Sequence, residues 1–302
     1  MYNVFIDGRE GTTGLQIYDR LMSRKDVKLL VLPEESRKDT EARKAMIDKA
    51  DVVFLCLPDA AAKEAVALAE NPETRIIDAS TAHRTAPGWA YGFPELSPDF
   101  RRAIAEGKRI ANPGCHASGF IALVYPLVAA GIVGADYPFV AHSVTGYSGG
   151  GKKMIAEYRA PERDAELDSP RQYALTLSHK HLPEMTGVCG LSREPVFQPI
   201  VADYYAGMCV FVPLFSDLMK TKLAPDGLRD FYRDFYRDAK LISVAGGTHA
   251  YLGSNNLAGR DRMEIFGGGK EGQLLACARF DNLGKGASGA AVQNMNVALG
   301  LE

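Results

Sequence analysis

Cys115 stands where a short strand-like segment passes into a helix-like one, a position at which a thiol can act as a nucleophile. RIAN (109–112), Pro113 and Gly114 precede it, and small and apolar residues follow. The dipole at the start of a helix favours the thiolate form. Of the other cysteines, Cys189 is undecided by its context, and the remaining three lie in apolar runs typical of a core: Cys56, Cys209 and Cys277. We therefore predict that Cys115 is a catalytic nucleophile.

A thiol nucleophile needs a proton acceptor, which is usually a histidine. Among the six histidines, His179 and His181 lie two residues apart in LSHKHLPEM, and Glu184 follows closely. A histidine beside a carboxylate suits general acid–base catalysis, so we expect His181 to take this role, with His179 as the alternative. The same pair could belong to a metal site, but no further ligand has a matching spacing, and we expect no metal.

A glycine-rich turn follows the first apolar segment, YNVFID, and opens a segment with helical spacing. Its pattern is Gly8-x-x-Gly11-x-x-Gly14, with Thr12 and Thr13 at the expected start of the helix. Glycines there allow a tight turn and a close approach to a pyrophosphate, and the helix offers free N–H groups. We expect these five residues to bind a dinucleotide, the alternative being a plain strand-to-helix turn.

The residues after the second apolar segment, VKLLVL, bear on which dinucleotide is bound. An NAD site usually places an acidic residue here for the ribose 2′-hydroxyl. In this chain Ser36, Arg37 and Lys38 could instead hold a 2′-phosphate, while Glu34 and Glu35 would repel it unless they face solvent. We therefore predict NADP(H) as the cofactor.

A glycine loop, TGYSGGGKK (145–153), is a candidate for holding an anionic substrate. Backbone N–H groups of such a loop can wrap around an anion. The spacing does not match the GxxxxGK[ST] loop of nucleoside triphosphatases. We expect Ser148 and Gly149 to contact the substrate, and a hairpin loop with exposed lysines is the alternative reading.

The first third of the chain alternates between strand-like and helix-like segments. Strands are expected at 2–7, 27–32, 51–58, 75–80 and 109–112, and helices at 12–23, 40–50 and 59–71. Short turns between such elements predict a Rossmann-like, doubly wound parallel sheet. Pro58, at the end of the third strand, is expected to contact the cofactor.

After Cys115 the pattern changes to a helix that is expected to break at Pro126, followed by a mainly antiparallel sheet. Its strands are expected at 139–146, 198–215, 241–253, 263–269 and 273–283, with helices at 223–239 and 288–301. The whole chain is then an α/β protein with a second, α+β domain. We expect an NADP-binding domain over 1–115, completed by a C-terminal helix in 286–302, and a catalytic and substrate or oligomerisation domain over 116–285.

The composition of the chain limits the classes of partner that we expect for the protein. The chain has 302 residues and a formal net charge of −2, so no basic excess indicates a nucleic-acid partner. No apolar run approaches the roughly 18 residues of a membrane span. The first residues lack the pattern of a secretory signal, and five scattered cysteines form no disulfide framework. We expect a cytoplasmic protein without a membrane partner.

Six motifs, in this order, carry a resemblance to a known family. They are the glycine turn 8–14, YGFPEL (91–96), NPGC (112–115), GYSGGGK (146–152), HKHLPEM (179–185) and NLGKGASG (282–289). The set resembles N-acetyl-γ-glutamyl-phosphate reductase, in its shorter sequence type, over nearly the whole chain. NPGC and HxPE together are specific, whereas the glycine turn alone is not.

The resemblance implies an enzyme of arginine biosynthesis that reversibly reduces N-acetyl-γ-glutamyl phosphate with NADPH and releases inorganic phosphate. It implies that Cys115 forms a thioester and that His181 is the acid–base residue. It also implies a fold like that of aspartate-semialdehyde and glyceraldehyde-3-phosphate dehydrogenases and a homodimer or homotetramer. Asn294 is expected at the nicotinamide. Further substrate contacts are expected from Arg84, Ser148, Gly149, His179 and Glu184.

One departure and three rival functions accompany this reading. The longer type of the family has an Asp-Phe-Arg wording where this chain has Thr81-Ala82-His83-Arg84, so only Arg84 carries over.

The nearest rival is an aspartate-semialdehyde dehydrogenase with the same chemistry on a shorter substrate. A cysteine hydrolase using Cys115 and His181 would leave the glycine turn without a role. A non-catalytic NADP-binding sensor predicts that Cys115→Ser binds NADP normally and that the native protein lacks reductase activity.

Overall fold

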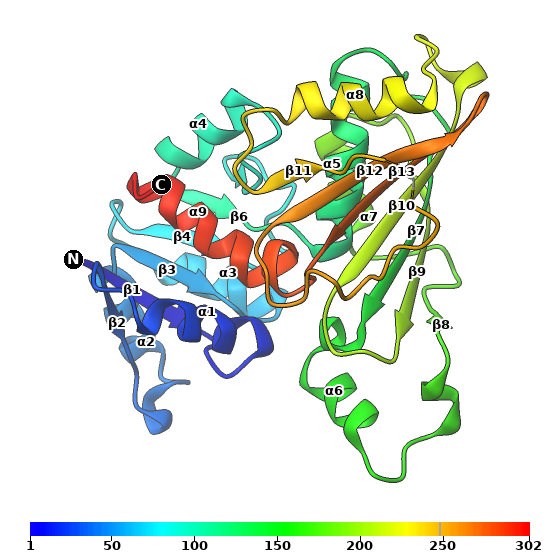
Figure 1. Ribbon diagram of the computed structural model, residues 1–302. Coiled ribbons are helices and arrows are strands. Elements are labelled where there is room, and N and C mark those ends of the chain that lie inside the picture. The colour runs from blue at the N-terminus through cyan, green and yellow to red at the C-terminus, as the bar shows by residue number, and fades with distance from the viewer. Residues whose placement is uncertain (248) are drawn as a thin grey trace. The chain divides into compact units, whose positions relative to one another are not determined.

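The computed structural model describes residues 1–247 and 249–302 (Figure 1). The described chain divides into two compact units, one formed by Met1–Pro113 with Ala287–Glu302 and the other by Gly114–Gly286. The C-terminal segment therefore returns to the unit that the N-terminus begins.

Among the described residues, the first unit is built on a six-stranded parallel sheet, which confirms the predicted parallel sheet and adds one short strand, Ala90–Tyr91, to the five expected. The strands, in spatial order, are β2 (Val27–Leu30), β1 (Tyr2–Asp7), β3 (Val52–Leu55), β4 (Arg75–Asp78), β6 (Arg109–Ala111) and β5 (Ala90–Tyr91). The helices are α1 (Thr12–Met22), α2 (Thr40–Lys49), α3 (Asp59–Leu68), α4 (Pro98–Glu106) and α9 (Gly289–Leu299). A 3₁₀ turn, Glu34–Ser36, follows β2.

Apolar side chains on both faces of this sheet pack against helices. On one face Val4 and Phe54 join side chains of α1, α4 and α9, among them Met295. On the other face Phe5 and Val53 join side chains of α2 and α3. A strand buried on both faces must be apolar throughout, and β3, with the sequence VVFL, is fully buried.

Among the described residues, the second unit is built on a seven-stranded sheet, which confirms the predicted mainly antiparallel order. Its strands, in spatial order, are β11 (Ile242–Val244), β12 (Met263–Lys270), β13 (Gln273–Phe280), β10 (Met208–Phe215), β7 (Val140–Gly146), β9 (Val196–Ala202) and β8 (Arg171–Gln172). Of the strand pairs that the structure describes in this sheet, β11–β12 and β7–β9 are the parallel ones. The segment expected as one strand at 198–215 forms two strands, Val196–Ala202 and Met208–Phe215. The strand expected at 241–253 is much shorter, and Thr248 within that range lies outside the described residues.

The helices described in this unit are α5 (Cys115–Ala129), α6 (Gly151–Arg159), α7 (Leu182–Cys189) and α8 (Pro225–Phe235). Short turns cover Tyr147–Gly150, Ala165–Asp168 and Ser216–Leu218, and a π-helical turn, Gly284–Ser288, precedes α9. Helix α5 packs on β10 and β13, and α8 packs on β12.

The expected break of the helix at Pro126 is wrong, because α5 runs through the proline. A proline has no N–H, so the carbonyl of Ala122, four residues earlier, loses its helical donor. The hydroxyl of Tyr236 donates a hydrogen bond of 2.7 Å to that carbonyl. A side chain from the end of α8 thus replaces the missing backbone donor, a long-range contact that local sequence rules do not contain.

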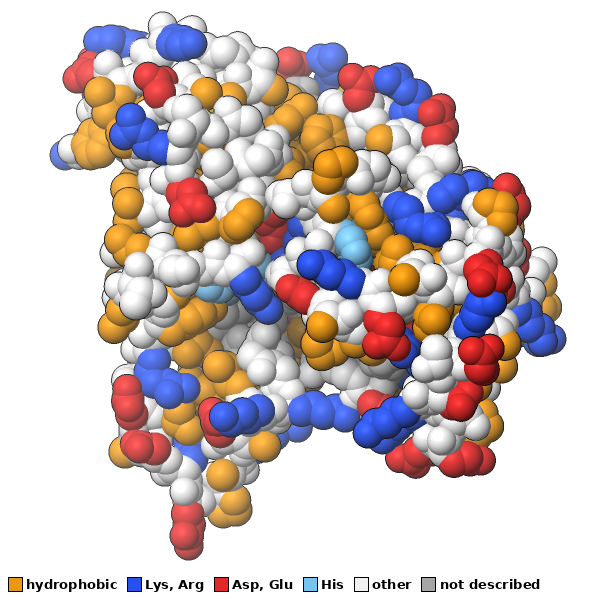
Figure 2. Space-filling model, turned by 180° about the vertical axis from the view of Figure 1, so that it is seen from behind, with side chains coloured by type: hydrophobic (Ala, Val, Ile, Leu, Met, Phe, Trp, Pro, Cys, Tyr) orange, Lys and Arg blue, Asp and Glu red, His pale blue; other side chains and the backbone are white. Residues whose placement is uncertain are grey.

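Basic and acidic side chains are interspersed over the face of the molecule in Figure 2, in keeping with the small net charge of the chain. Within the described residues, no helix combines the length and the hydrophobicity needed to cross a membrane.

Candidate active site

Cys115 is the first residue of α5, as the junction in the sequence predicted. Gly114 is the N-cap and provides no side-chain cap, but its own N–H donates a 3.2 Å hydrogen bond to Oε2 of Glu184. A Cβ at Gly286 would lie 2.9 Å from the Cβ of Cys115, closer than real side chains approach. Glycine at 286 therefore allows this segment to lie directly against the cysteine.

The histidine motif lies beside the start of α5, within the same unit. His181 is buried and immediately precedes α7, and Glu184 is buried in the first turn of that helix. The ring centroids of His179 and His181 are 4.7 Å apart, and Nδ1 of His179 accepts a 3.1 Å hydrogen bond from the His181 backbone. The ring of His116, next to Cys115 in the chain, lies 5.7 Å from that of His181.

His116 ties two further residues to this cluster. Its Nδ1 lies 2.7 Å from Oγ of Ser143, and its Nε2 lies 2.8 Å from the hydroxyl of Tyr173. Burial, with smaller contributions from His179 and Lys180, lowers the pKa of His116 to about 3. The imidazole is therefore neutral, so one ring nitrogen donates and the other accepts.

Tyr173 was not among the residues singled out from the sequence. Burial raises the pKa of its phenol, and the charge of nearby Cys115 raises it further. The phenol therefore stays protonated close to the thiol. The sequence offers one signal for it, a tyrosine six residues before the histidine pair, and tyrosines at such spacing are too common to identify a site.

The glycine loop between β7 and α6 is braced from a distant segment. Ser148 is buried, and its Oγ accepts a 3.0 Å hydrogen bond from Nδ2 of Asn282. Oδ1 of Asn282 accepts from the N–H of Gly207 at 2.8 Å. Lys152 and Lys153 are exposed. Asn282 therefore joins the Ser148 turn to Gly207; it lies in the motif NLGKGASG but was not among the candidate site residues predicted from the sequence.

The glycine turn in the first unit leaves no room for a side chain at two of its glycines. Gly8 has a φ of +84°, and a Cβ there would lie 2.4 Å from the carbonyl of Cys56, after β3. A Cβ at Gly14 would lie 2.5 Å from the carbonyl of Gly8. Helix α1 begins with Thr12 and Thr13, and its N-cap is Gly11. Because glycine has no side chain to accept a hydrogen bond, the first N–H groups of the helix have no side-chain cap.

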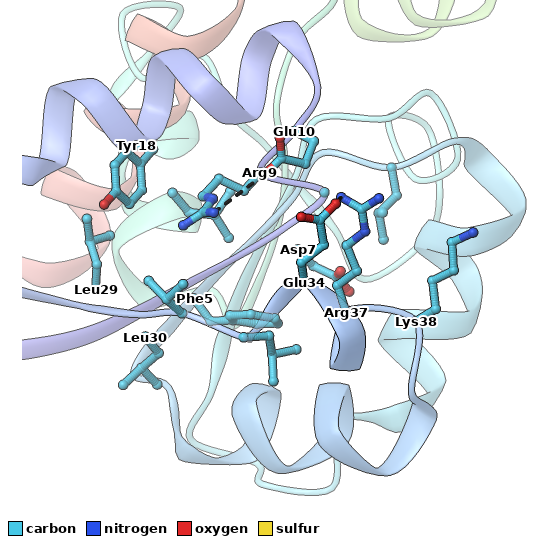
Figure 3. Close-up of a pocket in the computed structure, with 15 residues that line it drawn as sticks. Phe5, Asp7, Arg9, Glu10, Tyr18, Leu29, Leu30, Glu34, Arg37 and Lys38 are labelled. Atoms are coloured by element: carbon cyan, nitrogen blue, oxygen red, sulfur yellow. Dashed lines mark hydrogen bonds and ion pairs between the residues drawn. The ribbon is translucent and has the colours of Figure 1, made fainter.

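A pocket of about 360 Å³ opens beside this turn (Figure 3). Arg37 and Lys38 contribute to its lining, whereas Ser36 does not. Glu34, expected to face solvent, is exposed but also lines the pocket, and it pairs with Arg37 at 3.5 Å. Pro58 is exposed at the N-cap of α3, and its neighbour Leu57 lines the pocket instead.

Asn294 on α9 is fully buried in the first unit. Its Nδ2 donates to the carbonyl of Gly92 at 2.9 Å and to Oδ1 of Asn112 at 3.0 Å. No described residue donates a hydrogen bond to its Oδ1. A buried acceptor without a donor fits an incoming amide N–H, such as that of a nicotinamide carboxamide.

Arg84, half-buried in the same unit, donates to backbone carbonyls. Its Nε bonds the carbonyl of Asn112 at 3.1 Å, and its Nη2 bonds that of Ala79 at 3.2 Å. These bonds brace the backbone that leads to Cys115. Among the described residues, no group of His, Cys, Asp and Glu side chains could hold a metal ion.

Two family models match the chain in succession. The model described as semialdehyde dehydrogenase, NAD binding domain, matches residues 3–104, and that described as semialdehyde dehydrogenase, dimerisation domain, matches residues 115–282. Solved structures show the same fold at low identity. The chain is similar to an aspartate semialdehyde dehydrogenase from Francisella tularensis, with a TM-score of 0.74 and 14% identity over 98% of this chain and 99% of that one.

Curated relatives are much more similar in sequence. N-acetyl-gamma-glutamyl-phosphate reductase 2 of Pseudomonas putida is 46% identical, with 98% of this chain and 96% of that protein covered. N-acetyl-gamma-glutamyl-phosphate reductase of a Chelativorans species is 45% identical, with 98% and 97% covered. The chain therefore belongs to the semialdehyde dehydrogenase family and, within it, to the N-acetyl-gamma-glutamyl-phosphate reductases.

Proposed function

We propose that the protein reversibly reduces N-acetyl-γ-glutamyl phosphate to N-acetyl-L-glutamate 5-semialdehyde and inorganic phosphate, with NADPH as the reductant. This is the third step of arginine biosynthesis. The observation that carries the proposal is the start of α5, where Cys115 heads the helix and the preceding N–H is held by Glu184 of the histidine motif. The names and high identity of the curated relatives support the same reaction.

In this reaction Cys115 forms the bond to the acyl carbon and phosphate leaves with its bonding electron pair. The product of this step is a thioester on the protein, and covalent capture divides a difficult displacement into two easier ones. Bound NADPH supplies the hydride for reduction. His181 protonates the developing oxyanion and takes the proton back as the carbon–sulfur bond breaks, a contribution of about 10²–10⁴-fold in general. The phenol of Tyr173, which stays protonated, is a further donor near the thiol.

The first unit binds the dinucleotide in this proposal. The pyrophosphate lies on the turn formed by Gly8, Gly11 and Gly14 and on the N–H groups of Thr12 and Thr13. Arg37 and Lys38, which line the pocket, favour NADP over NAD, with Ser36 and Pro58 as further contacts. The unpartnered Oδ1 of Asn294 accepts from the nicotinamide carboxamide.

The second unit binds the substrate and forms the oligomer, a homodimer or homotetramer. Ser148, Gly149 and His179 contact the acyl phosphate in this proposal, and Arg84, a residue of the first unit, contributes its positive charge. Glu184 positions the start of α5, a role supported by its bond to Gly114. A cytoplasmic setting is in keeping with the lack of a disulfide among the cysteines of the described residues.

The test is the reverse reaction. Purified protein is given N-acetyl-L-glutamate 5-semialdehyde, NADP⁺ and phosphate, and NADPH formation is followed by absorbance. We expect a rate that requires phosphate and falls by more than about 10³-fold in Cys115→Ser, which lacks the nucleophile. A wild-type rate in Cys115→Ser would contradict the proposed thioester mechanism.

Rival functions give different results in the same assay. Faster turnover of aspartate semialdehyde would identify an aspartate-semialdehyde dehydrogenase. Hydrolysis without nucleotide would identify a cysteine hydrolase. A wild-type protein that binds NADPH but reduces or oxidises neither semialdehyde would be a non-catalytic binding protein.

A further inference from the structure

A buried carboxylate lies in the wall of the pocket in the first unit. Asp7, the last residue of β1, is 5% exposed and lines the pocket. In Figure 3 it lies on the same side of the pocket as Glu34, Arg37 and Lys38, whereas Tyr18 and Leu29 are on the other side. A negative charge there is unexpected if the pocket receives the phosphate groups of a dinucleotide.

Arg43 compensates this carboxylate from behind the pocket wall. It is 7% exposed on α2, and its Nε and Nη2 donate to the same oxygen of Asp7, Oδ2, at 3.1 and 2.9 Å. Its Nη1 donates to Glu64 of α3 at 3.0 Å. The Glu64 side chain is 56% exposed, so solvent screens its charge, whereas the Asp7–Arg43 pair is buried.

The charged side chains that line the pocket sum to zero, and Arg43, which is not among them, adds a positive charge that offsets the buried carboxylate. Three lining residues are basic, namely Arg9, Arg37 and Lys38, and three are acidic, namely Asp7, Glu10 and Glu34. Asp7 is the buried one among the acidic residues, and a buried charge is screened least by water and salt. Compensation of Asp7 therefore decides whether the pocket is positive enough for an anion.

We infer that Arg43 is a positioning residue for the cofactor: it holds Asp7 in the pocket wall and balances its charge, so that the 2′-phosphate of NADP can bind on the side of the pocket lined by Arg37 and Lys38. This inference rests on the proposed binding of NADP by the first unit. A purely structural alternative assigns the pair only to joining α2 to β1. The two readings differ in what they predict for NADPH relative to NADH, since NADPH carries the additional 2′-phosphate.

The experiment is a fluorescence titration of NADPH and of NADH into the full-length wild type and four variants: Arg43→Met, Asp7→Asn, Asp7→Asn/Arg43→Met and the control Arg24→Met. We expect Arg43→Met to weaken NADPH binding by at least tenfold and NADH binding by a clearly smaller factor. The double variant should regain most of the NADPH affinity, because it no longer contains the uncompensated carboxylate. Arg24 pairs with Asp26 away from the pocket lining, so Arg24→Met should bind both as the wild type does.

Two results would overturn the inference. One is equal weakening of NADPH and NADH binding in Arg43→Met, and the other is a double variant that binds NADPH as weakly as Arg43→Met. If Arg43→Met does not fold, Arg43→Lys, which keeps the charge and loses the paired hydrogen bonds, replaces it: near-wild-type selectivity for NADPH is expected, and a loss of that selectivity would overturn the inference. A wild type that binds neither dinucleotide would refute the proposed cofactor instead.

Discussion

The N–H of Gly114 donates a hydrogen bond of 3.2 Å to Oε2 of Glu184, which joins the residue before Cys115 to the first turn of α7. Both residues are buried. The bond connects NPGC with HKHLPEM, two motifs that are far apart in the sequence. The glutamate of the histidine motif therefore helps to hold the backbone from which the nucleophile projects.

This bond predicts different effects for two substitutions of Glu184. Glu184→Ala leaves the buried N–H of Gly114 without its acceptor, and we expect the free energy of unfolding to fall by about 1–3 kcal/mol. Glu184→Gln keeps an acceptor oxygen, so its loss should be clearly smaller. Urea unfolding measures both. Equal losses in the two variants would show that the Gly114 bond is not the important contact of Glu184.

The two histidines of the motif should differ in their effect on turnover. In the proposed mechanism His181→Asn removes the acid–base group, and we expect kcat to fall by about 10²–10⁴-fold. His179→Asn should act mainly on the KM for the acyl substrate. Steady-state kinetics of both variants, with NADPH affinity as the control for folding, measure this. A larger loss of kcat in His179→Asn than in His181→Asn would assign the acid–base role to His179.

Local sequence predicted those parts of the candidate site that consist of short motifs. Cys115 at a strand-to-helix junction and the glycine turn before α1 are visible because each is formed by consecutive residues. The doubly wound sheet follows from the alternation of apolar and helical segments.

The remaining features depend on contacts between distant segments. The bond from Asn282 to Ser148 spans 134 positions, and that from Arg43 to Asp7 spans 36. Nothing in either local sequence selects its partner. The helix through Pro126 is the clearest case, because a local rule predicts a break and Tyr236 supplies the donor that removes the need for one.

The low pKa of His116, about 3, predicts an acid-sensitive contribution to stability. The unfolded state takes up a proton near pH 6.5 and the folded state does not, so this contribution is complete above about pH 6.5 and is lost as the pH falls toward 3. Between pH 7.5 and 5.5 we expect the wild type to lose about 1.4 kcal/mol more unfolding free energy than His116→Gln. The other ionisable groups are common to both proteins, and parallel pH profiles would contradict the assignment.

The bond from Asn282 to Ser148 predicts a change in substrate affinity for an isosteric variant. Because Nδ2 of Asn282 donates, the Ser148 hydroxyl proton is available to the substrate in the proposed mechanism. In Asn282→Asp the carboxylate accepts that proton, while the acceptor for Gly207 remains. We expect the KM for the acyl substrate to rise about tenfold, as a lost hydrogen bond of about 1.4 kcal/mol would require.

Ser148→Ala is the matched control for this variant. It should raise the same KM by a similar factor and leave the KM for NADP unchanged. An Asn282→Asp enzyme with wild-type KM values would show that the Ser148 hydroxyl does not contact the substrate.

Tyr236 should be required for stability and not for catalysis. Its hydroxyl is the donor for the Ala122 carbonyl that Pro126 deprives of a helical partner, so Tyr236→Phe leaves a buried acceptor unsatisfied. We expect the free energy of unfolding to fall by about 1–3 kcal/mol and kcat to stay unchanged. Tyr232 is the matched control, because its hydroxyl bonds the carbonyl of Leu123 at 2.7 Å, and the residue four positions later, Leu127, has an N–H to donate. Urea unfolding should therefore show a smaller loss in Tyr232→Phe, and the reverse order would mean that the proline is accommodated in another way.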